Sequence, residues 1–333
     1  MSVTSLLPWH HALWQRLQSG QARQAHAWLL RGRSGIGKVD FALHWSRAWL
    51  CETPTADAMA CGQCSSCNWF EQGNHPDFRL LTLAQEDEAE GSTARKKATQ
   101  ISIAQVRALG SFFELSSHRA QRNRLVVIHP AEALNNSAAN ALLKMLEEPP
   151  ADMRFILVSH QSHLLLPTVI SRCRIVDMPM PTREQATYWL QSRGMQDAEQ
   201  LLDLAGGAPL QLTAGQMPEA KQTAQITQML AQGERLNPYT LATSCVALGM
   251  ETAIDMLQKW VHDLLSARLA GEVRYYRHEQ LAALAARADL AALLGLEQRL
   301  RQARRLASHP LNATLQFEAL LLQYMQLFTL KTA

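Results

Sequence analysis

Glycines and a lysine in the stretch LLRGRSGIGKVDF have the spacing of a phosphate-binding loop. The Walker A pattern is Gly, four residues, Gly, Lys and then Ser or Thr. Gly32, Gly37 and Lys38 occupy their expected positions and Gly35 lies between them, but Val39 stands where a hydroxyl would bind magnesium. Backbone N–H groups at a helix N-terminus can surround phosphates, and the lysine adds positive charge. The sequence therefore predicts a nucleotide-binding fold whose loop has lost a group needed for phosphoryl transfer.

A second part of a nucleotide-hydrolysing site is altered in LVVIHPAEALN. The apolar strand is present, but His129 and Pro130 occupy the two places where acidic residues would hold magnesium and position water. Glu132 lies two residues further along and would have to reach back around the turn. The combined losses argue against ATP hydrolysis here, whereas binding of ATP or ADP by the degenerate loop stays an open question.

Cysteines form a compact array, C-x9-C-x2-C-x2-C, at Cys51, Cys61, Cys64 and Cys67. Cys-x-x-Cys spacing lets two thiolates reach one ion from a tight turn. Four thiolates complete a closed tetrahedral shell with bonds of about 2.3 Å, which is typical of structural zinc. A redox Cys-x-x-Cys pair and unrelated buried cysteines are the alternatives.

Composition limits the classes of protein that the chain can belong to. Of its 333 residues, 47% are hydrophobic and 18% are charged, which is an ordinary globular balance. The net charge of +3 is too small to argue for nucleic-acid binding by itself. No apolar run approaches the roughly 20 residues that a membrane span needs, and MSVTSLLPWHHALW lacks the features of a signal peptide. We expect a cytoplasmic protein without a membrane partner, with reduced or metal-bound thiols.

Short apolar runs alternate with helical patterns in the first half of the chain, which indicates an α/β sheet covered by helices. Strands are expected within residues 25–32, 77–83, 124–130, 154–160 and 171–180, and helices within 38–51 and 137–150. Only helical patterns follow residue 181, with a Gly-Gly-Ala-Pro break at 206–209. We predict an α/β domain over residues 1–178 with the cysteine module at 51–67, a small helical unit over 179–213 and an all-helical unit over 214–333.

The P-loop, the four-cysteine module, NHPDF, ISIAQVR, NALLKMLEEPP and SRC occur in this order along the chain. Together they resemble the delta-prime family of bacterial DNA polymerase III clamp-loader subunits. These are AAA+ proteins related to the gamma/tau motor subunits and to replication factor C. The resemblance covers most of residues 20–210. It implies a RecA-like AAA+ P-loop domain with a zinc-binding insertion, a helical lid domain and an all-α C-terminal collar domain for oligomerisation.

Roles for individual residues follow from the resemblance. The motif at residues 171–173 matches the SRC motif of the family, which implies that Arg172 is an arginine finger reaching into the ATP site of a neighbouring gamma/tau subunit. A guanidinium suits this role because it stays charged and offers a planar fork of donors. The four cysteines match the zinc module of the family. The departures at Val39, His129 and Pro130, and a lid segment AGGAPLQL without a sensor arginine, imply a catalytically defective stator.

The implied function is ATP-dependent loading of the sliding clamp onto primed DNA, within a hetero-oligomeric ring that contains gamma/tau and delta subunits. The chain itself is then a DNA polymerase III holoenzyme component without intrinsic ATPase activity. One alternative is an active AAA+ motor of the gamma/tau type, which hydrolysis by the isolated chain would reveal. Another is a zinc protein that reads DNA sequence, which a gel-shift assay of the chain alone would test.

Overall fold

The computed structural model describes residues 5–18, 25–83, 99–114, 124–149, 152–213, 220–276, 278–305 and 312–329. The chain forms two compact units, Met1–Gln185 and Ala186–Ala333. The first unit is built on a sheet and the second contains helices within its described residues.

A five-stranded sheet organises the first unit, in the order β2-β3-β4-β1-β5 with every neighbouring pair parallel. The strand β1 lies between β4 and β5 and places Leu29 opposite Leu157 of β4 and Ile175 of β5. Because the strands are parallel, their carboxyl ends lie at one edge, where binding loops of α/β proteins gather. The strands are β1 (Ala27–Arg31), β2 (Phe78–Leu81), β3 (Arg124–Ile128), β4 (Met153–Ser159) and β5 (Arg174–Asp177).

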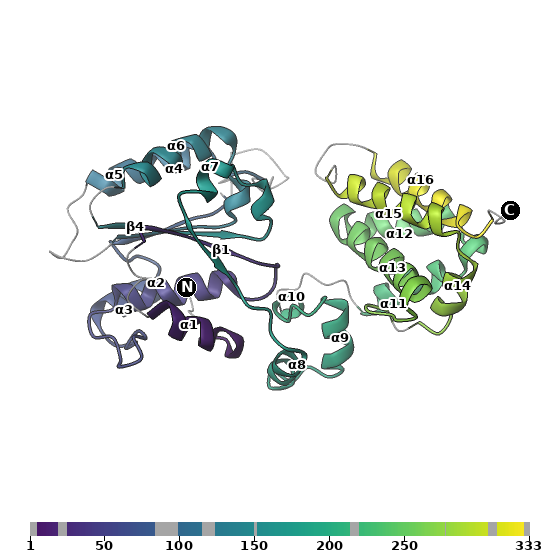
Figure 1. Cartoon of the computed structure of the whole chain (residues 1–333), viewed down its shortest axis with the longest axis horizontal. Helices are drawn as coiled ribbons and strands as arrows, with labels where there is room; N and C mark the ends of the chain where they lie inside the picture. The colour runs from purple at the N-terminus through teal and green to yellow at the C-terminus, as the bar shows by residue number, and fades with distance from the viewer. Residues whose placement is uncertain are drawn as a thin grey trace, which may run out of the picture. The chain divides into compact units, whose positions relative to one another are not determined.

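Helices cover both faces of this sheet (Figure 1). On one face, Leu29 shares an apolar core with the buried residues of α4 and α6. On the other face, the Trp28 ring contacts the rings of Trp45 and Trp49 at centroid distances of 5.2 and 4.8 Å. Burial on both faces explains why the inner strands β1, β3 and β4 are mostly apolar. The helices are α1 (His11–Gln18), α2 (Lys38–Leu50), α3 (Ser65–Glu71), α4 (Ile103–Arg107), α5 (Leu109–Glu114), α6 (Asn136–Glu147) and α7 (Pro167–Ile170).

The second unit has its own apolar core, centred on α13. The fully buried Trp260 donates from Nε1 to the Tyr324 hydroxyl (2.9 Å), which in turn donates to the Leu230 carbonyl (2.7 Å). These bonds tie α13, α16 and α11 together. After α8 (Arg183–Gln191), the helices are α9 (Ala198–Leu204), α10 (Leu210–Thr213), α11 (Ala220–Leu230), α12 (Pro238–Leu248), α13 (Met250–Ala270), α14 (Leu281–Arg287), α15 (Leu290–Arg305) and α16 (Ala313–Gln326).

The parallel α/β sheet followed by helices confirms the coarse architecture predicted from the sequence. The division of the helical part into a lid over residues 179–213 and a collar over 214–333 stays a prediction. Among the described helices, none combines the length and apolar character that a membrane span requires.

Candidate functional site

The glycine-rich loop connects β1 to α2, which is where the sequence placed a phosphate-binding loop. Gly37 caps the N-terminus of α2 in a left-handed conformation, with φ of +85°. This backbone conformation strains any residue with a side chain, and a Cβ atom here would also lie 2.2 Å from Cδ1 of Leu7, which would have to shift. The loop therefore retains the tight turn that such a motif needs.

Lys38 is held inside this loop, with only 2% of its surface exposed. Its Nζ donates to the carbonyl of Gly32 at 2.7 Å and also to the carbonyl of Arg33. Burial lowers the pKa of Lys38 to about 8, and the nearby Glu132 carboxylate opposes that shift. The ammonium is thus fixed by the backbone of its own loop.

A segment before α1 packs against the loop, a feature that the sequence analysis missed. The indole Nε1 of Trp9 donates to the Ile36 carbonyl at 2.9 Å. His10 is fully buried with its ring 5.3 Å from that of Phe41, and burial lowers its pKa to about 4. No local pattern signals these contacts, because Trp9 and Ile36 are 27 positions apart.

Two imidazoles lie beyond the ends of β3 and β4, where acidic and polar groups would complete an ATPase site. The rings of His129 and His160 are 5.1 Å apart, edge to face. Burial lowers the pKa of both, that of His160 to about 4, so both are neutral at pH 7. Glu132 accepts a hydrogen bond from the backbone N–H of His160 at 2.9 Å through Oε1. The Glu132 carboxylate therefore joins the loop after β3 to the loop after β4.

The four cysteine sulfurs converge from the end of α2, the following loop and the start of α3. All four Sγ atoms lie within 4.8 Å of one another. Cys51 and Cys64 are 3.9 Å apart, and Cys61 and Cys67 are 4.0 Å apart. A tetrahedron with metal–sulfur bonds of about 2.3 Å has edges of about 3.8 Å. The structure thus brings the predicted ligands together in a cluster that could hold a metal ion.

Hydrogen bonds and burial act in opposite directions on these thiols. A hydrogen bond with Thr53, followed by N–H groups of Gln63 and Cys64, lowers the pKa of Cys61 to about 5. Burial raises the pKa of Cys51, and that of Cys67 to about 12. A bound cation favours thiolates in such surroundings, because its charge offsets the cost of burying them. The donor set therefore fits a metal better than a redox pair, and all four cysteines are free of disulfides.

Arg172 follows α7, and 34% of its side chain is exposed. One guanidinium nitrogen donates to the Thr168 carbonyl at 3.0 Å and to Ser171 Oγ at 3.4 Å. Another forms an ion pair with Glu147, the last residue of α6 and the first glutamate of LEEPP. The sequence analysis assigned no role to Glu147, although it quoted the motif that contains it.

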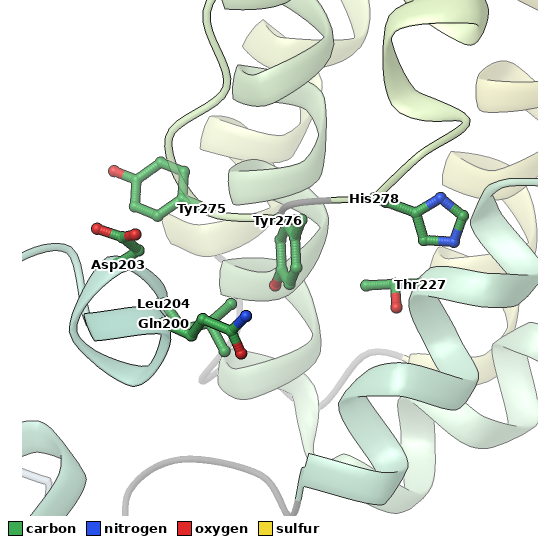
Figure 2. A pocket seen from close by; sticks show the side chains of 7 residues that line it. All are labelled: Gln200, Asp203, Leu204, Thr227, Tyr275, Tyr276 and His278. Carbon is green, nitrogen blue, oxygen red and sulfur yellow. The ribbon is translucent and has the colours of Figure 1, made fainter. Parts of the chain in front are cut away.

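A pocket of about 180 Å³ lies within the second unit, between α9, α11 and the segment after α13. Figure 2 shows the ring of Tyr276 between the side chains of α9 and the pair Thr227 and His278. None of the predicted site residues lines this pocket.

The wall of the pocket is fixed by Asp263, a fully buried carboxylate on α13. Its oxygens accept hydrogen bonds from the backbone N–H groups of Arg274, Tyr275 and Tyr276 at 2.6 to 3.1 Å. These bonds compensate the burial of the charge and set the position of both tyrosines.

The family model and the relatives of known name point to the same family. A family model described as "DNA polymerase III, delta subunit" matches residues 9–182. A Pseudomonas aeruginosa protein named DNA polymerase III subunit delta' is 35% identical, over 98% of this chain and 99% of its own length. An Escherichia coli protein of the same name is 32% identical, over 62% of this chain and 58% of its own length.

The solved structures that match are more distant. A Thermotoga maritima protein described as DNA polymerase III gamma subunit-related has a TM-score of 0.38 and 15% identity, covering 95% of this chain and 98% of its own. A Bacillus subtilis DNA clamp loader delta protein has a TM-score of 0.32 and 13% identity, covering 95% of this chain and 99% of its own.

Proposed function

Because the chain belongs to the delta-prime family of DNA polymerase III subunits, we propose that it serves the clamp loader as a catalytically silent stator. In this role it supplies Arg172 in trans to the ATP site of a neighbouring gamma/tau subunit. Its own P-loop keeps the shape of the α/β domain without hydrolysing ATP.

The replacement of both acidic positions beside a well-formed loop carries this proposal. His129 and Pro130 offer no carboxylate for magnesium, and Val39 offers no hydroxyl. Glu132 accepts from the backbone of His160, so one of its oxygens already has a structural partner. Phosphoryl transfer depends on a metal ion that neutralises the developing charge. Its ligands are missing, whereas Lys38 and the glycines that shape the loop are present.

The surroundings of Arg172 support a role outside the chain. Its partners Glu147 and Thr168 bind the two terminal nitrogens of the guanidinium, while a third of the side chain stays open to solvent. An arginine finger supplied in trans changes the rate of nucleotide hydrolysis by roughly 10³- to 10⁵-fold in GTPases. A partly exposed, pre-oriented guanidinium fits such a task.

We assign zinc to the four-cysteine cluster, with a structural role. Cys51, Cys61, Cys64 and Cys67 supply all four ligands of a tetrahedral ion, which leaves no position open for substrate. When bound, the ion would join the end of α2 to the start of α3 and stiffen the segment between them.

We propose that the C-terminal helices form the collar domain, through which the chain contacts the other subunits of the ring. Large apolar side chains are exposed on α12 and α16, with Tyr239 at 64% and Leu315 at 61%. Such side chains suit contacts with other subunits. We propose gamma/tau and delta subunits as these partners, and the sliding clamp and primed DNA as partners of the whole complex.

ATP turnover tests the proposal, measured for the isolated chain and for a reconstituted clamp loader. We expect no turnover by the isolated chain, and slower turnover by a complex that contains Arg172→Ala. Arg174→Ala is the matched control, since Arg174 is exposed on the adjacent strand β5. Two results together would instead establish the motor alternative. The isolated chain would hydrolyse ATP in a reaction that Lys38→Ala abolishes, and the complex that contains Arg172→Ala would turn over ATP at the wild-type rate.

A further inference from the structure

Two buried polar side chains lie beside the metal ligands without belonging to them. Ser66 stands on α3 between Cys64 and Cys67, and His75 belongs to the NHPDF stretch that leads into β2. Each is only 4% exposed. Neither takes part in the phosphate loop, and neither supplies a sulfur ligand.

Hydrogen bonds fix the direction in which these two side chains interact. The backbone N–H of Asp77 donates to His75 Nδ1 at 3.0 Å, so Nδ1 is an acceptor and the ring proton lies on Nε2. The Nε2–H group then donates to Ser66 Oγ at 2.8 Å. The Ser66 hydroxyl donates in turn to the carbonyl of Leu50 at 2.5 Å. The Ser66 hydroxyl therefore accepts one hydrogen bond and donates another, and the direction of each bond is fixed.

The two ends of this series of hydrogen bonds lie on different elements, the end of α2 and the sheet. Leu50 is the last residue of α2 and immediately precedes Cys51. At the other end, the carbonyl of Asp77 accepts from the N–H of Leu125 in β3 at 3.0 Å. Ser66 is also held through its own N–H, which donates to Glu52 Oε1 at 3.1 Å. The ligands on α2 and α3 are therefore joined to each other and to the sheet.

We propose that His75 and Ser66 are positioning residues for the metal module. They hold α3 against the end of α2, so that Cys51 meets Cys64 and Cys67 at ligand distance before the ion binds. This inference rests on the metal site proposed above. Residues outside the ligand set that orient metal ligands typically change metal affinity by about 10- to 100-fold when they are removed.

The rate of zinc release from the purified full-length chain tests this role. Transfer of the zinc to the chelator pyridylazoresorcinol reports that rate. We expect Ser66→Ala to accelerate release by about 10-fold, because the link to Leu50 is lost. Ser46→Ala is the matched control, since Ser46 is buried and its hydroxyl donates to Ala42 within the same helix. It should release zinc at the wild-type rate.

Two substitutions of His75 separate positioning from general packing. The amide of His75→Gln can replace the Nε2–H donor to Ser66, whereas His75→Asn can replace only the Nδ1 acceptor. We expect His75→Asn to release zinc as fast as Ser66→Ala, and His75→Gln to stay close to wild type. Combining Ser66→Ala with His75→Asn should add little, because both changes break one chain of bonds.

The outcomes distinguish this inference from the metal site itself. Wild-type protein purified without a metal ion would overturn the metal site, and the positioning role with it. Wild-type protein that holds zinc, with Ser66→Ala and His75→Asn releasing it at the same rate, would overturn the positioning role alone. Equal acceleration by Asn and Gln at position 75 would also contradict it, because packing rather than the bond to Ser66 would then govern release.

Discussion

The guanidinium of Arg172 forms an ion pair with the carboxylate of Glu147, joining the segment that follows α7 to the end of α6. Both side chains are partly exposed, at 34% and 48%. Exposed ion pairs contribute about 0–1 kcal/mol to stability, so this pair is a weak element of the fold. Its main effect is to set the direction of Arg172 while leaving the guanidinium able to exchange partners.

Replacing Arg172 with lysine should separate charge from geometry. A lysine keeps the positive charge but loses the planar fork of donors that matches phosphate oxygens. We therefore expect Arg172→Lys to lower ATP turnover of a reconstituted clamp loader by about 10-fold or more. The free energy of unfolding of the isolated chain should change by less than about 1 kcal/mol. Steady-state phosphate release and urea titration measure these two quantities.

Glu147→Gln is the partner experiment, because it removes the counter-ion and keeps the guanidinium. Turnover should stay within about threefold of wild type, since one charge-assisted bond is weakened and the finger remains. A loss as large as that of Arg172→Lys would contradict this view and would make Glu147 indispensable to the reaction.

Restoring the missing hydroxyl of the phosphate loop should not restore hydrolysis. Val39→Thr completes the Walker A pattern, but the two acidic positions are still occupied by His129 and Pro130. We expect no ATP turnover by the isolated Val39→Thr chain above the wild-type background. Turnover that appears in this variant and disappears with Lys38→Ala would show that other groups can hold the metal.

The sequence predicts those features that depend on residues close together in the chain. Three of the four cysteines lie within seven positions, and their spacing alone indicated a shared ion. The buried strands were equally clear, because a strand covered on both faces is a continuous apolar run. The ends of parallel strands then place the loop after β1 at an edge of the sheet.

Contacts between distant residues were outside the reach of such patterns. The bond from Trp9 to the Ile36 carbonyl and the ion pair of Arg172 with Glu147 depend on how helices pack on the sheet. Neither has a periodicity or a fixed spacing. Glu132 is a similar case, because its bond to the N–H of His160 requires β3 and β4 to be neighbours.

Metal content gives a direct test of the cysteine cluster. We expect one zinc ion per wild-type chain, and much less than one in Cys64→Ser, because the closed shell would lose a thiolate. Cys173→Ala is the control, since Cys173 is buried in the apolar core of the sheet and is not part of the cluster. Elemental analysis after gel filtration measures the ratio. Equal zinc in Cys64→Ser and Cys173→Ala would exclude a four-cysteine site.

Acid should weaken the first unit through His10. Burial holds its pKa at about 4, below the ordinary value of 6.5, so protonation favours the unfolded chain. The contribution of neutral His10 to the free energy of unfolding is therefore complete above about pH 6.5 and is lost as the pH falls toward 4. Between pH 8 and pH 5 it amounts to about 2 kcal/mol. Nearby His11 and His44 act in the same direction, because their positive charges also disfavour protonated His10.

Urea titrations at these two pH values check the effect of His10. Between pH 8 and pH 5, the free energy of unfolding of His10→Leu, which cannot titrate at this position, should fall by about 2 kcal/mol less than that of wild type. His163→Leu changes an exposed histidine and should retain the wild-type difference. If His10→Leu and His163→Leu showed the same pH dependence, His10 would not be the group responsible.

Asp263 should be the most sensitive polar position of the second unit. It is fully buried, and its carboxylate accepts hydrogen bonds from the backbone N–H groups of Arg274, Tyr275 and Tyr276. An asparagine would present an amide N–H to donors that need an acceptor, while removing the charge that strengthens each bond. We therefore expect Asp263→Asn to reduce the free energy of unfolding by about 3 kcal/mol.

Asp255→Asn provides the matched comparison for that measurement, because Asp255 lies on the same helix. Its ion pairs with Lys259 and Arg304 are partly exposed to solvent, so their loss should reduce the free energy of unfolding by only about 1 kcal/mol. Amide hydrogen exchange at Tyr275 and Tyr276 should accelerate in Asp263→Asn alone, because only that variant weakens the hydrogen bonds of these two N–H groups. Similar stability losses in the two variants would mean that the N–H groups of the segment find water as readily as the carboxylate, and that Asp263 does not determine the wall of the pocket.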